Sequence, residues 1–225
     1  MRRVLIFLAC LAGLASLIRH FPLAWAGVLL PQGMGTYSGT IWNGQISQVP
    51  LLGSVKLDGR LGSARLTSAP GDVTFSGDVS PRGVKDLVLS MPVARLPISD
   101  TRLLGLDGRV SLRIEQAVIA DGACQSATGR ASTDVLSVNG SRFQWSGPTL
   151  SGPVDCMDGR LRVRLSGKDS TQSVNATILT GLDGIYQTDI SVESNDPLAG
   201  NALALFGFTP TSNGQFELSE QGRWR

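Results

Sequence analysis

Polar and apolar side chains alternate strictly along several stretches of this chain. Val110, Leu112 and Ile114 are separated by polar or charged residues, and the same pattern occurs over 160–166 and 186–193. A period of two with one polar side is typical of antiparallel strands that bury one face of their sheet. Weaker versions occur at Val55/Leu57, Val73/Phe75, Leu87/Leu89/Met91, Phe143/Trp145, Val174/Ala176/Ile178 and Phe216/Leu218.

Turn-forming dipeptides separate these stretches. Asp-Gly occurs at 58–59, 107–108, 121–122, 158–159 and 183–184, and Asn-Gly occurs at 43–44, 139–140 and 213–214. Both dipeptides tolerate the positive φ that tight hairpin turns require. The sequence therefore predicts an all-β meander of hairpins rather than alternating strands and helices.

Asp-Gly-Arg recurs three times, at 58–60, 107–109 and 158–160. The spacing could mark an internal repeat of about fifty residues. The alternative is that the same hairpin chemistry is used three times, since little around the motif repeats. Either interpretation predicts a stack of hairpins.

One stretch departs from the period of two. Leu198, Ala202, Leu205 and Phe206 recur at helical spacing after Asp196-Pro197. Proline is favoured in the first turn of a helix. A short C-terminal helix is therefore predicted over 197–206, ending near Gly207.

The N-terminus has the pattern of a membrane-targeting segment. Met1–Arg3 is basic, and Val4–Ile18 contains no charge, which gives about 22 Å of helix. One interpretation is a cleaved signal peptide with Ala24-Trp25-Ala26 as its cleavage site. The other is an uncleaved anchor that extends past Arg19 and His20. Both predict that the rest of the chain crosses the membrane, with the N-terminus cytoplasmic.

The three cysteines are divided between the apolar N-terminal run and the rest of the chain. Cys10 lies in the apolar N-terminal run, whereas Cys124 and Cys156 form an even pair in the remainder. If that remainder is periplasmic, its oxidising compartment favours a disulfide between them.

Catalytic and cofactor-binding motifs are missing from the sequence. The single histidine, His20, adjoins the apolar run, so a Ser-His-Asp or Cys-His centre is not expected in the remainder. No phosphate-cradling or zinc-protease motif occurs. With a net charge of +2 and scattered basic residues, nucleic-acid binding is not expected either. The sequence predicts a non-enzyme without catalytic, cofactor-binding or metal residues.

An open sheet also has edges that must be covered, charged or used for strand addition. That requirement points to binding partners or to a lipid-facing groove.

Several motifs, in order along most of the chain, resemble the type II secretion system protein N family. In that family, a Leu-Pro precedes a Ser-Gly-Thr-aliphatic-Trp-x-Gly element after the membrane segment. The matching segments are Leu30-Pro31, Tyr37–Gly44, Cys124 with Gly129–Ala131, Leu150–Cys156 with Asp158-Gly159, Asp196–Leu198, Ala202–Gly207, Asn213-Gly214 and Gly222–Trp224. The stretch 54–100 is only loosely alike.

The resemblance implies a single-pass component of the bacterial inner membrane that supports export of folded periplasmic proteins. It implies an uncleaved anchor and interfacial segment over residues 1–30, in contact with membrane lipid, and a periplasmic β domain over residues 31–225. Partners would be other inner-membrane or periplasmic secretion subunits, contacted by sheet edges and the Trp42 region. Trp42 could instead be a rim aromatic that only supports folding.

The family is also similar to the broader AsmA-like group, whose curved sheets form open grooves proposed to carry lipid. That similarity implies an elongated, curved antiparallel sheet with an open groove or half-barrel form. It also supplies an alternative function, in periplasmic lipid handling or envelope maintenance.

Overall fold

The computed structural model describes residues 20–23, 35–49, 52–96, 105–211 and 214–223. Its strands form one antiparallel sheet with the order β1-β2-β3-β4-β5-β6-β7-β8-β9-β10-β11-β12-β14-β13. The strands are β1 (Thr36–Gly39), β2 (Asn43–Val49), β3 (Gly53–Arg60), β4 (Ser63–Ser68), β5 (Thr74–Ser80), β6 (Gly83–Pro92), β7 (Arg109–Ala120), β8 (Ala123–Thr133), β9 (Leu150–Met157), β10 (Arg160–Lys168), β11 (Gln172–Thr180), β12 (Ile185–Ser194), β13 (Thr209–Pro210) and β14 (Gln215–Arg223). The predicted all-β meander is confirmed.

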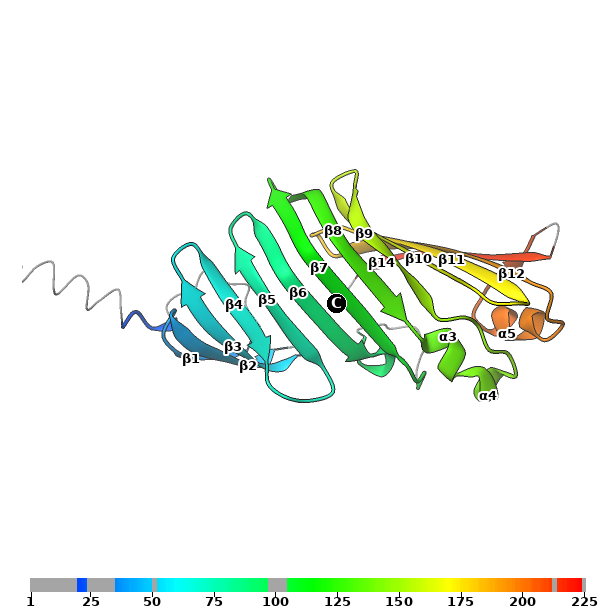
Figure 1. Ribbon diagram of the computed structural model, residues 1–225, viewed down its shortest axis with the longest axis horizontal. Helices are drawn as coiled ribbons and strands as arrows, with labels where there is room; N and C mark the ends of the chain where they lie inside the picture. The colour runs from blue at the N-terminus through cyan, green and yellow to red at the C-terminus, as the bar shows by residue number, and fades with distance from the viewer. Residues whose placement is uncertain (1–19, 24–34, 50–51, 97–104, 212–213, 224–225) are drawn as a thin grey trace, which may run out of the picture.

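The sheet is long and strongly twisted (Figure 1). Strands β1–β8 cross the long axis of the molecule obliquely, whereas β10–β14 run nearly along it. Right-handed strand twist accumulates across an open sheet, so the two ends of the sheet face different directions.

Short helices lie at the C-terminal half of the sheet: α3 (Val135–Val138), α4 (Gly140–Phe143) and α5 (Ala199–Leu205). The predicted C-terminal helix is confirmed as α5, two residues shorter at its start and one at its end. A 3-10 turn, η2 (Val93–Arg95), follows β6.

Three of the predicted turn dipeptides do not form hairpin turns between strands. Asp58-Gly59 lies inside β3, Asn43-Gly44 begins β2, and Asn139-Gly140 joins α3 to α4. At Gly59, a Cβ would lie 1.9 Å from the backbone oxygen of Ile41. The glycine there permits a close approach of two chain segments instead of a positive φ. Asp58-Gly59-Arg60 and Asp158-Gly159-Arg160 thus occupy different structural positions, which favours the interpretation without a repeat.

The strand predicted from Phe143 and Trp145 is also wrong. Phe143 ends α4, and Gln144 then adopts a left-handed conformation with φ of 54°. Phe143 and Trp145 nevertheless pack in the same hydrophobic cluster. In a strand, residues two apart share a face because the backbone is pleated. Here the left-handed residue produces the same result after a helix.

The predicted N-terminal membrane helix and the Ala24–Ala26 site lie outside the described residues, as does most of 1–30. No helix in the described part of the chain combines the length and hydropathy that a membrane span needs.

Candidate interaction surfaces

The apolar side chains of the strands line up into one face of the sheet. In the register of β9, β10 and β11, Val163 lies between Val154 and Ile178. Val163 is partly buried and Val154 is buried. Because antiparallel neighbours in register share a face, this apolar row continues from strand to strand along the sheet.

Over the C-terminal half, helices cover this face. A buried cluster joins helix α5 to strands β9, β11 and β12 and consists of Trp145, Leu150, Val174, Val192, Ala199, Ala202 and Leu203. Burying side chains of the size of Val174 or Leu203 contributes about 1.5–3 kcal/mol each. This cluster is therefore the packed core of the domain.

A buried polar network fixes the segment after α4 onto the hairpin between β10 and β11. Trp145 Nε1 donates to Gln172 Oε1 at 2.7 Å, and Gln172 Nε2 donates to Ser146 O at 2.5 Å and to Asp169 Oδ2 at 2.8 Å. The bond from Gln172, followed by that from the Thr171 backbone N–H, lowers the pKa of Asp169. These bonds satisfy the buried amide and indole groups, so the network closes one end of the apolar face.

Over the N-terminal half, the apolar face stays partly exposed. Leu57 pairs with Leu66 across β3 and β4, and Leu89 lies between Phe75 and Leu112 across β5, β6 and β7. These five side chains are all only partly buried. Partly exposed apolar side chains in two rows of this kind can bind apolar groups.

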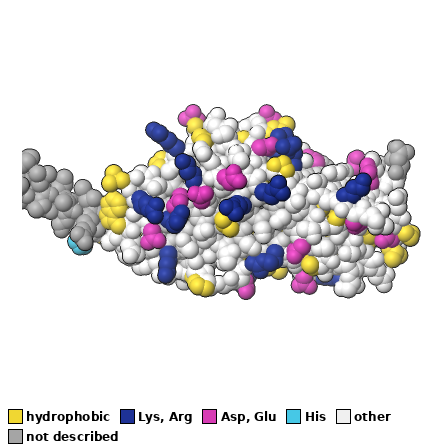
Figure 2. Space-filling model, viewed as in Figure 1, with side chains coloured by type: hydrophobic (Ala, Val, Ile, Leu, Met, Phe, Trp, Pro, Cys, Tyr) yellow, Lys and Arg dark blue, Asp and Glu magenta, His cyan; other side chains and the backbone are white. Residues whose placement is uncertain are grey.

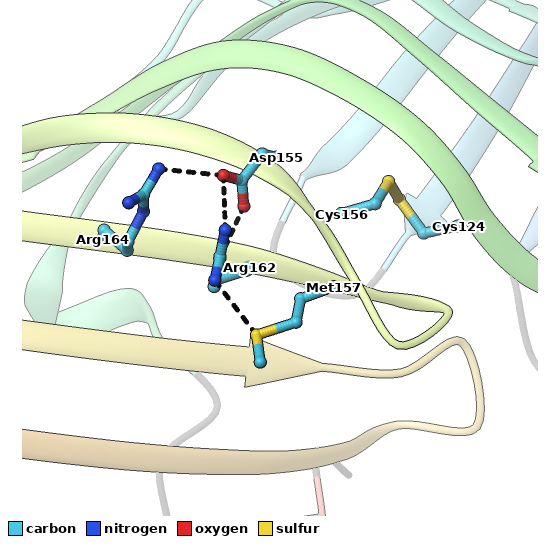
Figure 3. Close-up of polar contacts among 6 residues, drawn as sticks. All are labelled: Cys124, Asp155, Cys156, Met157, Arg162 and Arg164. Carbon is cyan, nitrogen blue, oxygen red and sulfur yellow. Dashed lines mark hydrogen bonds and ion pairs between the residues drawn. A yellow bond between two sulfur atoms is a disulfide. The ribbon is translucent and has the colours of Figure 1, made fainter.

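Cys124 and Cys156 are joined by a disulfide between adjacent strands β8 and β9 (Figure 3), with their Cα atoms 5.7 Å apart. The register of β7 and β8 shifts between Val118 and Ile119, which leaves Gln125 as an extra residue. A one-residue bulge reverses which face the following side chains occupy. Cys124 is consequently opposite Ile119, on the apolar face.

The opposite face of the sheet is polar. Figure 2 shows one broad side of the molecule, on which charged side chains are spread widely and hydrophobic ones lie mainly toward the rim. Across β4 and β5, Arg65 donates two hydrogen bonds to Asp78, at 3.0 and 2.7 Å. The bond from Arg65 lowers the pKa of Asp78.

A second ion-pair cluster lies on β9 and β10 (Figure 3). Asp155 accepts from Arg162 at 2.7 and 2.8 Å and from Arg164 at 3.0 Å, and Arg162 also donates to the sulfur of Met157 at 3.0 Å. The Arg162 hydrogen bond is the main reason why the pKa of Asp155 is lowered. The alternating arginines of 160–164 thus lie on the polar face, as the alternation predicts, and one aspartate forms ion pairs with two of them.

At the N-terminal corner, a short segment packs against the start of the sheet. Pro22 bridges Thr40, and the Ile41 N–H donates to Phe21 O at 3.1 Å. Leu23 is only 2% exposed, and a Cβ on Gly44 would lie 2.6 Å from its Cδ2. The glycine of the Thr40–Gly44 motif therefore makes room for Leu23.

Trp42 lies in the same corner, in the bend between β1 and β2, where it is partly buried. Its backbone oxygen accepts from the Gly59 N–H at 2.9 Å. Trp42 thus holds the β1–β2 bend against β3. Its role in partner binding stays a prediction.

The sheet edge at β14 is covered over only part of its length. On the outer side of β14, strand β13 pairs with Phe216 and Glu217, and no other strand in the described part of the chain lies along the rest of this edge. Glu217, Glu220 and Arg223 provide charges along this edge, which is how natural sheets limit edge-to-edge association.

A shallow polar hollow lies where β10, β11, β12 and β14 end, and its lining includes Asp169, Gln172, Glu193 and Gln215. Asp169 is held by Thr171 and Gln172, and Glu193 accepts from Ser173 and Gln215. No group of three or more potential metal ligands gathers within the described ranges. The expectation of a protein without catalytic, cofactor-binding or metal residues stays a prediction.

Sequence reasoning missed Leu23 and Gln172, and it placed Trp145 on a strand instead of after helix α4. The only signal for Leu23 was its place beside the apolar run, and a glutamine such as Gln172 carries no signal until its partner is known.

Comparison with known families gives one match. The family model for type II secretion system (T2SS) protein N matches residues 33–219, which include every strand up to most of β14. No curated protein and no solved structure matches the chain.

Proposed function

Because the chain belongs to the type II secretion system protein N family, we propose that it is a single-pass inner-membrane component of the type II protein secretion machinery. The family match over 33–219 is the observation that carries this proposal. The periplasmic sheet would bind other inner-membrane or periplasmic subunits and so support export of folded proteins. As a component of this machinery, the protein would be a structural and interaction subunit rather than an enzyme.

The proposed topology rests on the N-terminal sequence. Arg2 and Arg3 stay in the cytoplasm, Val4–Ile18 with the residues that follow contacts membrane lipid, and the sheet lies in the periplasm. A disulfide joining Cys124 to Cys156 is in keeping with an oxidising compartment. The packing of Phe21–Leu23 on the Thr40–Gly44 corner would hold the first strands close to the membrane surface.

Crosslinking in cells tests this function. Crosslinked cells would be solubilised in detergent, the chain purified through a C-terminal tag, and the associated proteins identified by mass spectrometry. We expect enrichment of other secretion-system membrane subunits over an unrelated inner-membrane protein with the same tag, together with a peptide that begins at Met1. A chain that begins at Gly27 would replace the anchor with a cleaved signal, and phospholipid without any secretion subunit would contradict the machinery role.

The partly exposed apolar face over β3–β7 favours a second function, in periplasmic lipid handling. Leu66, Leu89 and Leu112 on that face are only partly buried, so the sheet could act as an open groove for acyl chains. Phospholipid extracted from gently purified protein would then fall several-fold in Leu112→Glu. Leu61→Glu, at a turn residue that is 96% exposed, is the matched control and should leave the lipid unchanged. Equal lipid recovery from both variants would contradict this function.

A further inference from the structure

Two arginines lie directly opposite each other on the polar face. Arg113 of β7 pairs in register with Arg130 of β8, and both side chains are exposed. Side chains directly opposite in an antiparallel pair have Cβ atoms about 5 Å apart, and like charges in such positions repel. The native sheet therefore keeps an unfavourable pair at its centre.

Some other arginines on the sheet have carboxylate partners within the chain. Arg65 is bound by Asp78, and Arg162 and Arg164 are bound by Asp155, in each case from the adjoining strand. Among the described residues, the side chains of Arg113 and Arg130 have no hydrogen-bond or ion-pair partner. The arrangement around Asp155 shows what a carboxylate does on this face when it lies beside two arginines: it accepts from both.

Apolar side chains flank the arginine pair. Val88 of β6 is opposite Arg113 and is 41% exposed. Pro153 of β9 is opposite Arg130 and is also exposed. Because all four residues are in register, Val88, Arg113, Arg130 and Pro153 form one row across β6–β9, which we call the arginine row. Arginine with apolar neighbours is typical of the centre of a protein–protein interface.

We propose that the arginine row docks an acidic segment of another secretion subunit. A partner carboxylate would lie between the guanidinium groups of Arg113 and Arg130 and accept from both, as Asp155 accepts from Arg162 and Arg164. Apolar neighbours of that carboxylate would pack on Val88 and Pro153. This assignment rests on the proposed function, because it takes the partner to be a subunit of the machinery.

Charge favours a protein carboxylate over an anionic membrane surface. Segments that bind anionic lipids present clusters of four to eight basic residues, whereas the arginine row has two, with Asp155 close by on β9. The planar guanidinium group of arginine also binds a carboxylate through two parallel hydrogen bonds. Arg113 and Arg130 can donate such bonds to one carboxylate from its two sides.

A single substitution separates binding from folding. Arg113→Glu places a carboxylate opposite Arg130, so an ion pair inside the sheet replaces the repulsion and occupies the site. We expect the thermal midpoint of the full chain to stay equal or rise, while docking is lost. Arg82→Glu, at an exposed arginine in the β5–β6 turn, changes the net charge equally and serves as the matched control.

Docking would be measured in cells with a photo-crosslinking residue at Thr128, which is exposed two residues from Arg130 on β8. We expect an adduct with a secretion subunit, reduced at least tenfold by Arg113→Glu and unchanged by Arg82→Glu. An unchanged adduct in Arg113→Glu, while the subunits still co-purify, overturns the arginine row alone. Binding of the detergent-purified chain to vesicles of anionic phospholipid, lost in Arg113→Glu, also overturns it in favour of a membrane. If no secretion subunit co-purifies with the unsubstituted chain, the proposed function fails and the arginine row fails with it.

Discussion

The indole Nε1 of Trp145 donates a 2.7 Å hydrogen bond to Oε1 of Gln172, which lies 27 residues further along the chain. Both residues are buried, at 5% and 6% exposure. The bond joins the segment that follows α4 to the β10–β11 hairpin, beneath helix α5. It therefore connects the part of the chain that covers the apolar face to the strands that form that face.

Trp145→Phe keeps an aromatic ring in the cluster and removes the donor. Gln172 Oε1 then stays buried without a partner, which costs about 1–3 kcal/mol. We expect urea denaturation followed by circular dichroism to show a loss of this size. Gln172→Leu added to Trp145→Phe should cost less than the sum of the two single changes, because the pair acts together. Additive losses would show that the bond contributes little.

The cysteine pair offers a chemical test of both pairing and compartment. Alkylation of the unreduced, denatured protein should label neither Cys124 nor Cys156, while Cys10 provides an internal positive control. Replacing both cysteines by alanine should lower the free energy of unfolding by about 3–4 kcal/mol in the chain-entropy description of a loop of this length. Labelling of both cysteines in protein from cells would contradict the disulfide and weaken the periplasmic assignment.

The meander was predictable because alternation of polar and apolar residues with a period of two indicates antiparallel strands that bury one face of their sheet. The strands around Ile114, Val163 and Ile190 appear where alternation predicts them. Helix α5 was predictable for a similar reason, since its apolar residues recur at helical spacing after Pro197.

Other features depend on contacts that alternation does not encode. Gly59 resembles a turn glycine in sequence, yet it lies within β3 because the backbone of Ile41 approaches it. The bulge at Gln125 sets the face that Cys124 occupies, and nothing in the local sequence marks it. The polar face was predictable, but whether an arginine meets Asp155 or another arginine depends on strand register alone.

Acid should weaken the cluster around Asp155. Its pKa is lowered mainly by the hydrogen bond from Arg162, so its contribution to stability is present above the unfolded-state pKa of about 3.9 and is lost as pH falls through the lower folded-state pKa. We expect Asp155→Asn to cost about 1 kcal/mol at neutral pH, as a partly exposed ion pair does. Urea denaturation from pH 8 to pH 3 should show this difference constant down to pH 5 and shrinking below pH 4.

The matched control for this titration is Asp121→Asn, at a turn residue with φ of 51°, where asparagine is equally well accommodated. The free energy of unfolding of Asp121→Asn should differ little from that of the unsubstituted protein over the whole pH range. A cost of Asp155→Asn that grows on acidification would contradict the ion-pair account.

The packing of Leu23 on Gly44 predicts a local effect without global unfolding. In Gly44→Ala, the new Cβ would lie 2.6 Å from Leu23 Cδ2 and 2.7 Å from Thr40 O, so the Phe21–Leu23 segment should separate from the corner. We expect faster amide hydrogen exchange at Leu23 and Ile41, measured by mass spectrometry, with little change in the exchange of β10 and β11. Gly71→Ala is the control, because a Cβ there meets nothing within 4 Å, and it should leave exchange at both positions unchanged. Equal amide exchange at Leu23 and Ile41 in the two variants would mean that the packing of Leu23 does not depend on Gly44. The contact between Phe21–Leu23 and the Thr40–Gly44 corner would then be weak and would not hold the segment on the sheet.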